Sequence, residues 1–251
     1  MRRSVIRGIF AACLLVFLLG QVAPVEAQSS SAQQLRRSPD ATRPGLDYWL
    51  YLPSDFSSDA TEPIPLLLFL HGGGEGGSDP EKVKKHGPPK LIRQGRDFPC
   101  IVVSPQNPST TQHWDDQQLI ELVDHLIESF PVDTSRLYLT GLSRGCYGGW
   151  RLLVQNPDRF AAYVGICGGG LAPYAKRLAK VPVRLYHGAD DPVIPVDESE
   201  RMLEAHVAAG GDAKLVVYLE TGHDAWTQTY ENNAVFDWLF AQRRANSTAR
   251  P

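Results

Sequence analysis

Three residue types that can together cleave an acyl bond stand at separate points along the chain. Ser143 lies in the stretch GLSRG, directly after the apolar run RLYLT. Serine is a weak nucleophile unless a base takes its proton. Two aspartates follow in YHGADDPVIP, at Asp190 and Asp191, and a histidine follows in LETGHDAW, at His223. This order predicts acyl transfer in which His223 accepts the Ser143 proton and one of the two aspartates orients the imidazole.

The glycines around Ser143 indicate a tight corner between a strand and a helix. Gly141 and Gly145 have no Cβ atoms, so the strand and the helix can approach each other closely around the serine. The backbone N–H of Arg144, at the helix start, would then face the developing oxyanion. The bland alternative is a serine that only caps the helix.

A second oxyanion donor is expected from the glycine-rich stretch FLHGGGEGGSD, residues 69–79, with Gly73 as the candidate. The same stretch could be interpreted as a phosphate cradle. It lacks the Gly-Lys-Ser/Thr of a P-loop, and no acidic residue stands where a dinucleotide-binding fingerprint needs one, which argues against nucleotide binding.

Apolar runs that alternate with helical patterns must position these residues. We expect helices near 119–130, 144–155, 197–209 and 226–243, and strands at 46–52, 64–70, 100–104, 136–140, 161–167, 183–187 and 214–220. Such alternation predicts the α/β class, with a mostly parallel sheet covered by helices on both faces. The three candidate catalytic residues each follow a strand, at the edge where open parallel sheets form their sites.

The N-terminal residues are typical of an export signal. In residues 1–27, arginines precede an apolar run, and Val-Glu-Ala supplies a small-x-small cleavage site. We therefore predict a periplasmic or secreted protein; an uncleaved membrane anchor is the alternative, although the apolar run is short for one. Residues 28–45 are polar and indicate a flexible leader. Residues 46–245 are then a single catalytic domain.

Composition limits the partners. The 251 residues are 43% hydrophobic, enough for a core, and their formal net charge is −3. Removing residues 1–27, with three arginines and one glutamate, makes the chain more acidic. This argues against nucleic acid and against stable membrane insertion after signal cleavage. No Cys-x-x-Cys spacing or other ligand cluster indicates a metal or cofactor, and the oligomeric state stays open.

The chain as a whole resembles the α/β-hydrolase superfamily. It is similar in particular to the bacterial esterases and "predicted peptidases" related to dienelactone hydrolases, phospholipase/carboxylesterases and polyhydroxybutyrate-depolymerase-like esterases. The matching stretches span most of the chain after the leader: PLLLFLHGGGEGGSD, FPCIVVSPQ, RLYLTGLSRGCYGGW, PDRFAAYVGICGGG, VPVRLYHGADDPVIPV and TGHDAW. The acid of this group is the fifth residue of a His-Gly-x-x-Asp motif, and counting from His187 favours Asp191 over Asp190.

Two departures from the pattern of this group follow the serine. The group usually has an apolar residue where this chain has Arg144, and a Gly-Gly pair where this chain has Gly145-Cys146. The Arg144 side chain could bind an acidic substrate group or, as we favour, pair with a structural carboxylate. Cys146 could pair with Cys167, although sequence gives no distance between them.

The resemblance implies a secreted serine carboxylic-ester hydrolase without a cofactor. The connection at 168–182, which often carries a lid in this superfamily, is too short for a large one. We therefore expect minimal or no lid, and short-chain or polymer-attached acyl esters, such as acetyl or feruloyl groups on polysaccharide, as substrates. Trp114 and Trp226 could line the cleft or could equally be aromatic residues of the core or the rim. The alternatives are a serine peptidase of prolyl-oligopeptidase-like type and a catalytically inactive binding module on the same fold.

Overall fold

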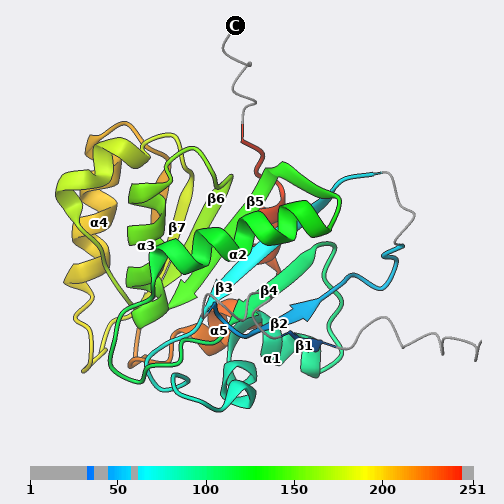
Figure 1. The fold of residues 1–251 in the computed structure, drawn as a ribbon. Helices are drawn as coiled ribbons and strands as arrows, with labels where there is room; N and C mark the ends of the chain where they lie inside the picture. Colours follow the sequence, from blue (N-terminus) through cyan, green and yellow to red (C-terminus); the bar gives the residue numbers. More distant parts are fainter. Residues whose placement is uncertain (1–32, 37–44, 58–61, 245–251) are drawn as a thin grey trace, which may run out of the picture.

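The computed structural model describes residues 33–36, 45–57 and 62–244. Their strands form one eight-stranded sheet in the order β1-β2-β4-β3-β5-β6-β7-β8 (Figure 1). β1 pairs antiparallel with β2 and β2 with β4, whereas the strands from β4 across to β8 run parallel. This arrangement confirms the predicted fold class.

The elements alternate along the chain as predicted. The strands are β1 (Gln34–Arg36), β2 (Tyr48–Tyr51), β3 (Ile64–Leu70), β4 (Ile101–Pro105), β5 (Val132–Leu142), β6 (Ala162–Ile166), β7 (Val183–Gly188) and β8 (Ala213–Tyr218). The α-helices are α1 (Gly87–Arg93), α2 (Asp116–Ser129), α3 (Arg144–Gln155), α4 (Asp197–Ala208), α5 (Trp226–Glu231) and α6 (Asn233–Phe240). Two 3₁₀ helices, η1 (Pro80–Lys85) and η2 (Ala172–Leu178), complete the described elements.

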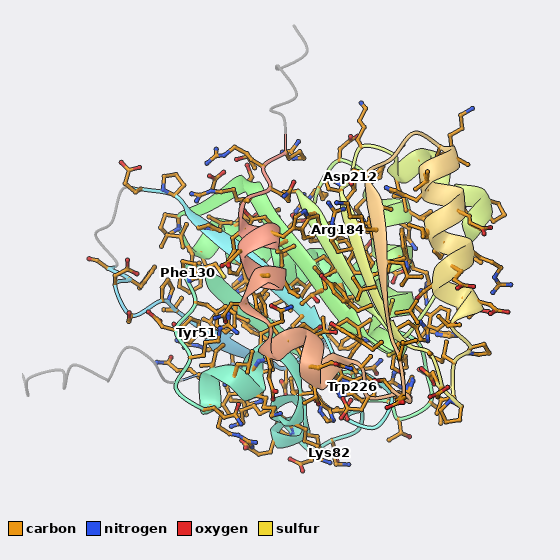
Figure 2. All side chains as sticks on the ribbon, turned by 180° about the vertical axis from the view of Figure 1, so that it is seen from behind. Tyr51, Lys82, Phe130, Arg184, Asp212 and Trp226 are labelled. Atoms are coloured by element: carbon orange, nitrogen blue, oxygen red, sulfur yellow. The ribbon has the colours of Figure 1, made fainter. Side chains whose placement is uncertain are left out.

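Helices bury both faces of the sheet. In Figure 1, α2, α3 and α4 lie in front of the strands, and Figure 2 shows the C-terminal helices over the opposite face. Successive side chains of a strand point to opposite faces. Leu66, Leu68 and Leu70 of β3 accordingly join the core on the first face, and Leu67 and Phe69 join the core on the second. A strand covered on both faces must be apolar throughout, which explains the run IPLLLFL.

The structure differs from the sequence expectation in several local elements. The helix expected at 226–243 is two helices, because Asn232 leaves the helical conformation and its side chain accepts the N–H of Ala234 at 3.0 Å. Two helices that were not predicted, η1 and α1, lie between β3 and β4. The connection at 168–182 contains the single short helix η2, in agreement with the expectation of a minimal lid.

The predicted leader is partly structured. Gln34, Leu35 and Arg36 pair with Leu50, Trp49 and Tyr48 in an antiparallel register, so this part of residues 28–45 is an edge strand, and the expectation of a wholly flexible leader is wrong there. Polar residues suit an edge strand because one side of it faces solvent. The predicted signal peptide, residues 1–27, lies outside the described residues. Within the described ranges, no helix combines the length and apolarity that crossing a bilayer requires.

The three described cysteines, Cys100, Cys146 and Cys167, are buried free thiols. Cys146 and Cys167 therefore do not form the disulfide that the sequence left open. Burial raises the pKa of both thiols to about 12, so they are protonated at neutral pH.

Helix α3 packs so closely on β3 that position 145 has no room for a side chain. A Cβ atom placed on Gly145 would lie 2.0 Å from the carbonyl oxygen of Leu70 and 2.7 Å from that of His71. Both neighbours are backbone atoms, which cannot turn away. The spacing between helix and strand at the serine corner therefore depends on Gly145.

Replacing Gly145 by alanine should lower the free energy of unfolding by about 3 kcal/mol, because the new methyl group pushes α3 off the strand. Chemical denaturation of the variant measures this loss. Gly74→Ala is the matched control, since a Cβ there meets nothing within 4 Å, and we expect a change within about 0.5 kcal/mol. Equal stability of the two variants would contradict the close packing.

Candidate active site

Ser143 occupies the corner between β5 and α3 in a strained backbone conformation. Its φ is 52° and its ψ is −122°, values that side-chain-bearing residues rarely adopt. The Ser143 N–H donates to the carbonyl of Ile166 at 2.8 Å, and the Ser143 carbonyl accepts the N–H of Cys146 at 2.8 Å. A Cβ on Gly141 would lie 2.4 Å from the Gly145 carbonyl oxygen. The neighbouring strand and the glycines thus hold the strained serine in place, as a functional corner requires.

The structure brings His223 and Asp191 to this corner in one line of hydrogen bonds. The Ser143 Oγ lies 3.0 Å from His223 Nε2, and Asp191 Oδ2 lies 2.7 Å from His223 Nδ1. Asp191 follows β7 and His223 follows β8, so the parallel strands deliver both groups to the same edge of the sheet. Asp190 is exposed beside them, and the aspartate in contact with the histidine is Asp191, as the His-Gly-x-x-Asp spacing predicted.

The surroundings of Asp191 keep its carboxyl group ionised. Its side chain is 0% exposed, and this burial alone would raise the pKa. Hydrogen bonds from His223 and from the N–H groups of Ile194 and Val193 more than offset burial, and the pKa lies below its ordinary value. A carboxylate only accepts hydrogen bonds. His223 therefore carries its proton on Nδ1, and its Nε2 is free to accept the proton of Ser143.

His187 is a second histidine against Asp191, and the sequence analysis gave it no role beyond marking the motif. Its Nε2 lies 3.2 Å from Asp191 Oδ2 and 2.9 Å from the Ile194 carbonyl, both of them acceptors, so this nitrogen carries a proton. Its Nδ1 meets the Ser199 hydroxyl at 2.8 Å. The buried ring thus helps to fix the turn that carries Asp191. The sequence did offer one signal for such a role, because His187 is a polar residue in a mostly apolar strand.

The stretch 72–76, which we call the oxyanion loop, lies directly against the serine. A Cβ on Gly72 would be 3.4 Å from the Ser143 Cβ, and Gly73 follows at once. The loop closes on itself through the Gly76 N–H, which donates to the Gly73 carbonyl at 3.2 Å. The predicted donors, the N–H groups of Gly73 and Arg144, therefore belong to the two segments that flank Ser143.

Sequence reasoning missed three polar side chains here: Glu75 within the oxyanion loop, and His71 and His86 beside it. The buried carboxylate of Glu75 accepts the Gly72 N–H at 3.1 Å, and its other oxygen lies 3.6 Å from His86 Nε2. His71 donates from Nδ1 to the Gly72 carbonyl at 2.7 Å, because its Nε2 accepts the Asn107 N–H at 3.0 Å. Burial lowers the pKa of His71 to about 4, so the ring is neutral at neutral pH.

The Arg144 side chain makes its hydrogen bonds to the backbone and not to the structural carboxylate that we favoured. It donates to backbone carbonyls, from Nη1 to Gln112 at 3.0 Å and from Nη2 to Gly72 at 3.3 Å. The structural carboxylate that we favoured as its hydrogen-bond partner is replaced by these carbonyl oxygens. Such contacts leave no mark in the sequence, since every residue has a carbonyl.

The two tryptophans proposed for the cleft lie in different surroundings. Trp114 is only 2% exposed, belongs to the core beneath α2 and α3, and donates from Nε1 to the His71 carbonyl at 3.3 Å. Its prediction as a cleft residue is therefore wrong, because the large ring fills the core. Trp226 begins α5 (Figure 2) and is half-buried. Its ring lies edge-on to His223 with 5.0 Å between centroids, which places it beside the site.

Among the described residues, one group of three could offer ligand atoms to a metal ion: Cys167, Asp191 and His223. Asp191 and His223 are already joined by their own hydrogen bond, and the Cys167 thiol is protonated at neutral pH because burial raises its pKa. A metal ligand would need the thiolate. This donor set therefore fits a Ser–His–Asp arrangement better than a metal site.

Comparisons with known proteins agree with this geometry. Residues 95–236, more than half of the chain, match the family model described as Phospholipase/Carboxylesterase. A bifunctional acetylxylan esterase/xylanase of Neocallimastix patriciarum is 26% identical over 166 residues, which are 64% of this chain and 23% of that protein. The chain thus spans about a quarter of the length of this curated relative.

Solved structures show the same fold. A thermostable esterase superposes with a TM-score of 0.73 at 28% identity, over 86% of this chain and 64% of that one. An acetyl xylan esterase from Aspergillus awamori superposes with a TM-score of 0.62 over 82% of this chain and 99% of that one, and at 14% identity it shows the fold alone. By its sequence match and its architecture, the chain belongs to the phospholipase/carboxylesterase family of α/β-hydrolase folds.

Proposed function

We propose that the chain is a serine ester hydrolase that works through an acyl-enzyme. The observation that carries this proposal is the continuous line of hydrogen bonds from Asp191 through His223 to Ser143, at a strained corner on the strand ends. An ionised buried acid, a histidine with its proton on Nδ1 and a serine within 3.0 Å of Nε2 are the parts that acyl transfer needs. Family membership supports the same chemistry.

The reaction has two steps. Ser143 Oγ attacks the ester carbonyl carbon while its proton passes to His223 Nε2, and the N–H groups of Gly73 and Arg144 stabilise the oxyanion. The histidine then gives this proton to the leaving alcohol, and an acyl-serine remains. In the second step, His223 takes a proton from water as the water oxygen attacks the acyl carbon. The bond from this carbon to Ser143 Oγ then breaks, His223 returns the proton to Ser143, and the acid leaves. Asp191 stabilises the imidazolium at each stage, and the steps use only this chain's own residues and water.

For substrates, we propose short-chain esters or acyl groups carried on a polymer, such as acetyl or feruloyl groups on polysaccharide. The short connection that holds η2 leaves no room for a large lid over the serine. The relative named as an acetylxylan esterase/xylanase supports acetyl groups on polysaccharide as one such substrate. Residues 1–27, with their signal-like pattern, support action outside the cytoplasm.

The first test is the initial rate on p-nitrophenyl acetate, butyrate and decanoate, with the full chain expressed with its own leader. We expect faster turnover of the acetate and butyrate than of the decanoate, because the connection that holds η2 is too short to form an apolar tunnel for a long chain. Ser143→Ala should lower the rate at least about 10⁴-fold. Acetyl release from acetylated xylan then tests the polymer substrate.

The same assay separates the alternatives. A peptide p-nitroanilide cleaved faster than the esters would favour the serine peptidase. A wild-type chain that turns over neither substrate and is not labelled by a serine-reactive phosphonate would favour the inactive binding module. Ester turnover that survives Ser143→Ala would overturn the assignment of the nucleophile.

Replacing Asp191 by asparagine should lower kcat by about 10³–10⁴-fold, because the amide favours the wrong histidine tautomer. The adjacent Asp190→Asn is the matched control: this side chain is exposed, and we expect its kcat within about twofold of the wild type. Steady-state kinetics on p-nitrophenyl acetate measure both variants. A larger loss for Asp190→Asn than for Asp191→Asn would reverse the assignment of the acid.

A further inference from the structure

We propose that the Arg144 side chain is a positioning residue that aims and polarises the Gly73 N–H through the Gly72 carbonyl. This inference rests on the proposed esterase function, in which that N–H holds the oxyanion. It gives the guanidinium a task separate from that of the Arg144 backbone.

The first step of the argument is the geometry of one peptide bond. The Gly72 carbonyl and the Gly73 N–H belong to the same planar trans unit and point in opposite directions. Whatever holds the carbonyl therefore sets the direction of the N–H. The carbonyl is held by two donors, His71 Nδ1 at 2.7 Å and Arg144 Nη2 at 3.3 Å. Hydrogen bonds to the oxygen also polarise the peptide, which makes the N–H a stronger donor.

The second step is the charge of these two donors. His71 must keep its proton on Nδ1, since Nε2 accepts the Asn107 N–H, and its burial keeps the ring neutral. Arginine is charged at every pH at which proteins fold. Of the two groups on the Gly72 carbonyl, Arg144 is therefore the one that brings a full positive charge.

The third step is the charge that Arg144 faces. The Glu75 carboxylate is 9% exposed and accepts the Gly72 N–H at 3.1 Å. A negative charge so close to Gly73 opposes the formation of an oxyanion. Burial lowers the pKa of Arg144, and attraction to Glu75 raises it, so the two charges stabilise each other. The guanidinium thus offsets the charge of the carboxylate that anchors the other end of Gly72.

The guanidinium is also packed against the oxyanion loop. A Cβ on Gly76 would lie 2.6 Å from Arg144 Nη2. Nη1 reaches the Gln112 carbonyl at 3.0 Å and so connects this loop to the segment that precedes α2. Arg144 Nε is buried without a hydrogen-bond partner among the described residues, which costs stability. The unpaired Nε lowers the stability that the buried guanidinium can contribute to the fold. A role at the active site explains this side chain better than a contribution to folding does.

The test compares Arg144→Met and Arg144→Lys in the full chain. Arg151→Met is the matched control, because Arg151 lies on the same helix and also donates to a backbone carbonyl, that of Trp114 at 3.3 Å. Its other partner is the buried Asp116 carboxylate at 2.8 Å, so we expect the control to lose stability and not kcat. We measure kcat and KM on p-nitrophenyl acetate, and the affinity for an aryl trifluoromethyl ketone. Attack of Ser143 on this ketone gives a tetrahedral oxyanion without a leaving group, so its affinity reports the oxyanion site.

We expect Arg144→Met to lower kcat and the affinity for the ketone by the same factor, about 10- to 100-fold, less than the full loss of an oxyanion donor. KM should change by less than about threefold, because the ground-state carbonyl does not depend on this charge. Arg144→Lys should recover part of both losses, since an ammonium can still donate to Gly72. Assayed at a temperature at which the variant is folded, Arg151→Met should have the kcat of the wild type.

Three results would overturn the inference. The first is a kcat of Arg144→Met equal to that of Arg151→Met, and the second is a change in KM alone. The third comes from assaying p-nitrophenyl hemisuccinate, an ester with an acidic group, and is a loss of activity on this ester but not on the acetate. The last would show that the side chain binds an acidic substrate group. Should Arg144→Met fail to fold, Arg144→Lys and Arg144→Gln decide the question by the same comparison. A wild-type chain without ester turnover would instead refute the proposed function itself.

Discussion

The site depends on neighbouring elements that hold Ser143 in its strained backbone conformation from three sides. β6 accepts its N–H through Ile166, α3 closes over its carbonyl, and Gly145 lets that helix rest on the carbonyl oxygens at the end of β3. A positive φ on a serine persists only where the surroundings determine it fully. Here β6, α3 and the end of β3 supply that determination, so the nucleophile is placed by the sheet and by the helix that packs on it.

Around this corner, buried polar groups are arranged by what they can donate or accept. Hydrogen-bond donors surround the Asp191 carboxylate and so fix the position of the His223 proton. Gly72 is held on both sides, its N–H by Glu75 and its carbonyl by His71 and Arg144. Such preorganised dipoles need little rearrangement when charge develops, and this is the largest single source of catalysis in many enzymes.

Sequence reasoning succeeded where a residue type and a strand end coincide. Ser143 and His223 were found from their order and their positions after apolar runs, and Asp191 from the spacing of the resembling family. It failed where burial decides the outcome: Trp114 is in the core, although it was a candidate to line the cleft. It also could not find the contacts of the Arg144 side chain, because backbone carbonyls are acceptors at every position and only the fold selects two of them.

The strand Gln34–Arg36 has a consequence for the edge of the sheet. It covers the outer backbone of β2, which would otherwise be the open edge of the sheet on that side. An open edge offers unpaired N–H and carbonyl groups to any other strand and promotes aggregation. With β1 present, the outermost strand on this side is a short polar segment, and a chain cut at residue 45 would instead expose the buried strand β2 as the edge.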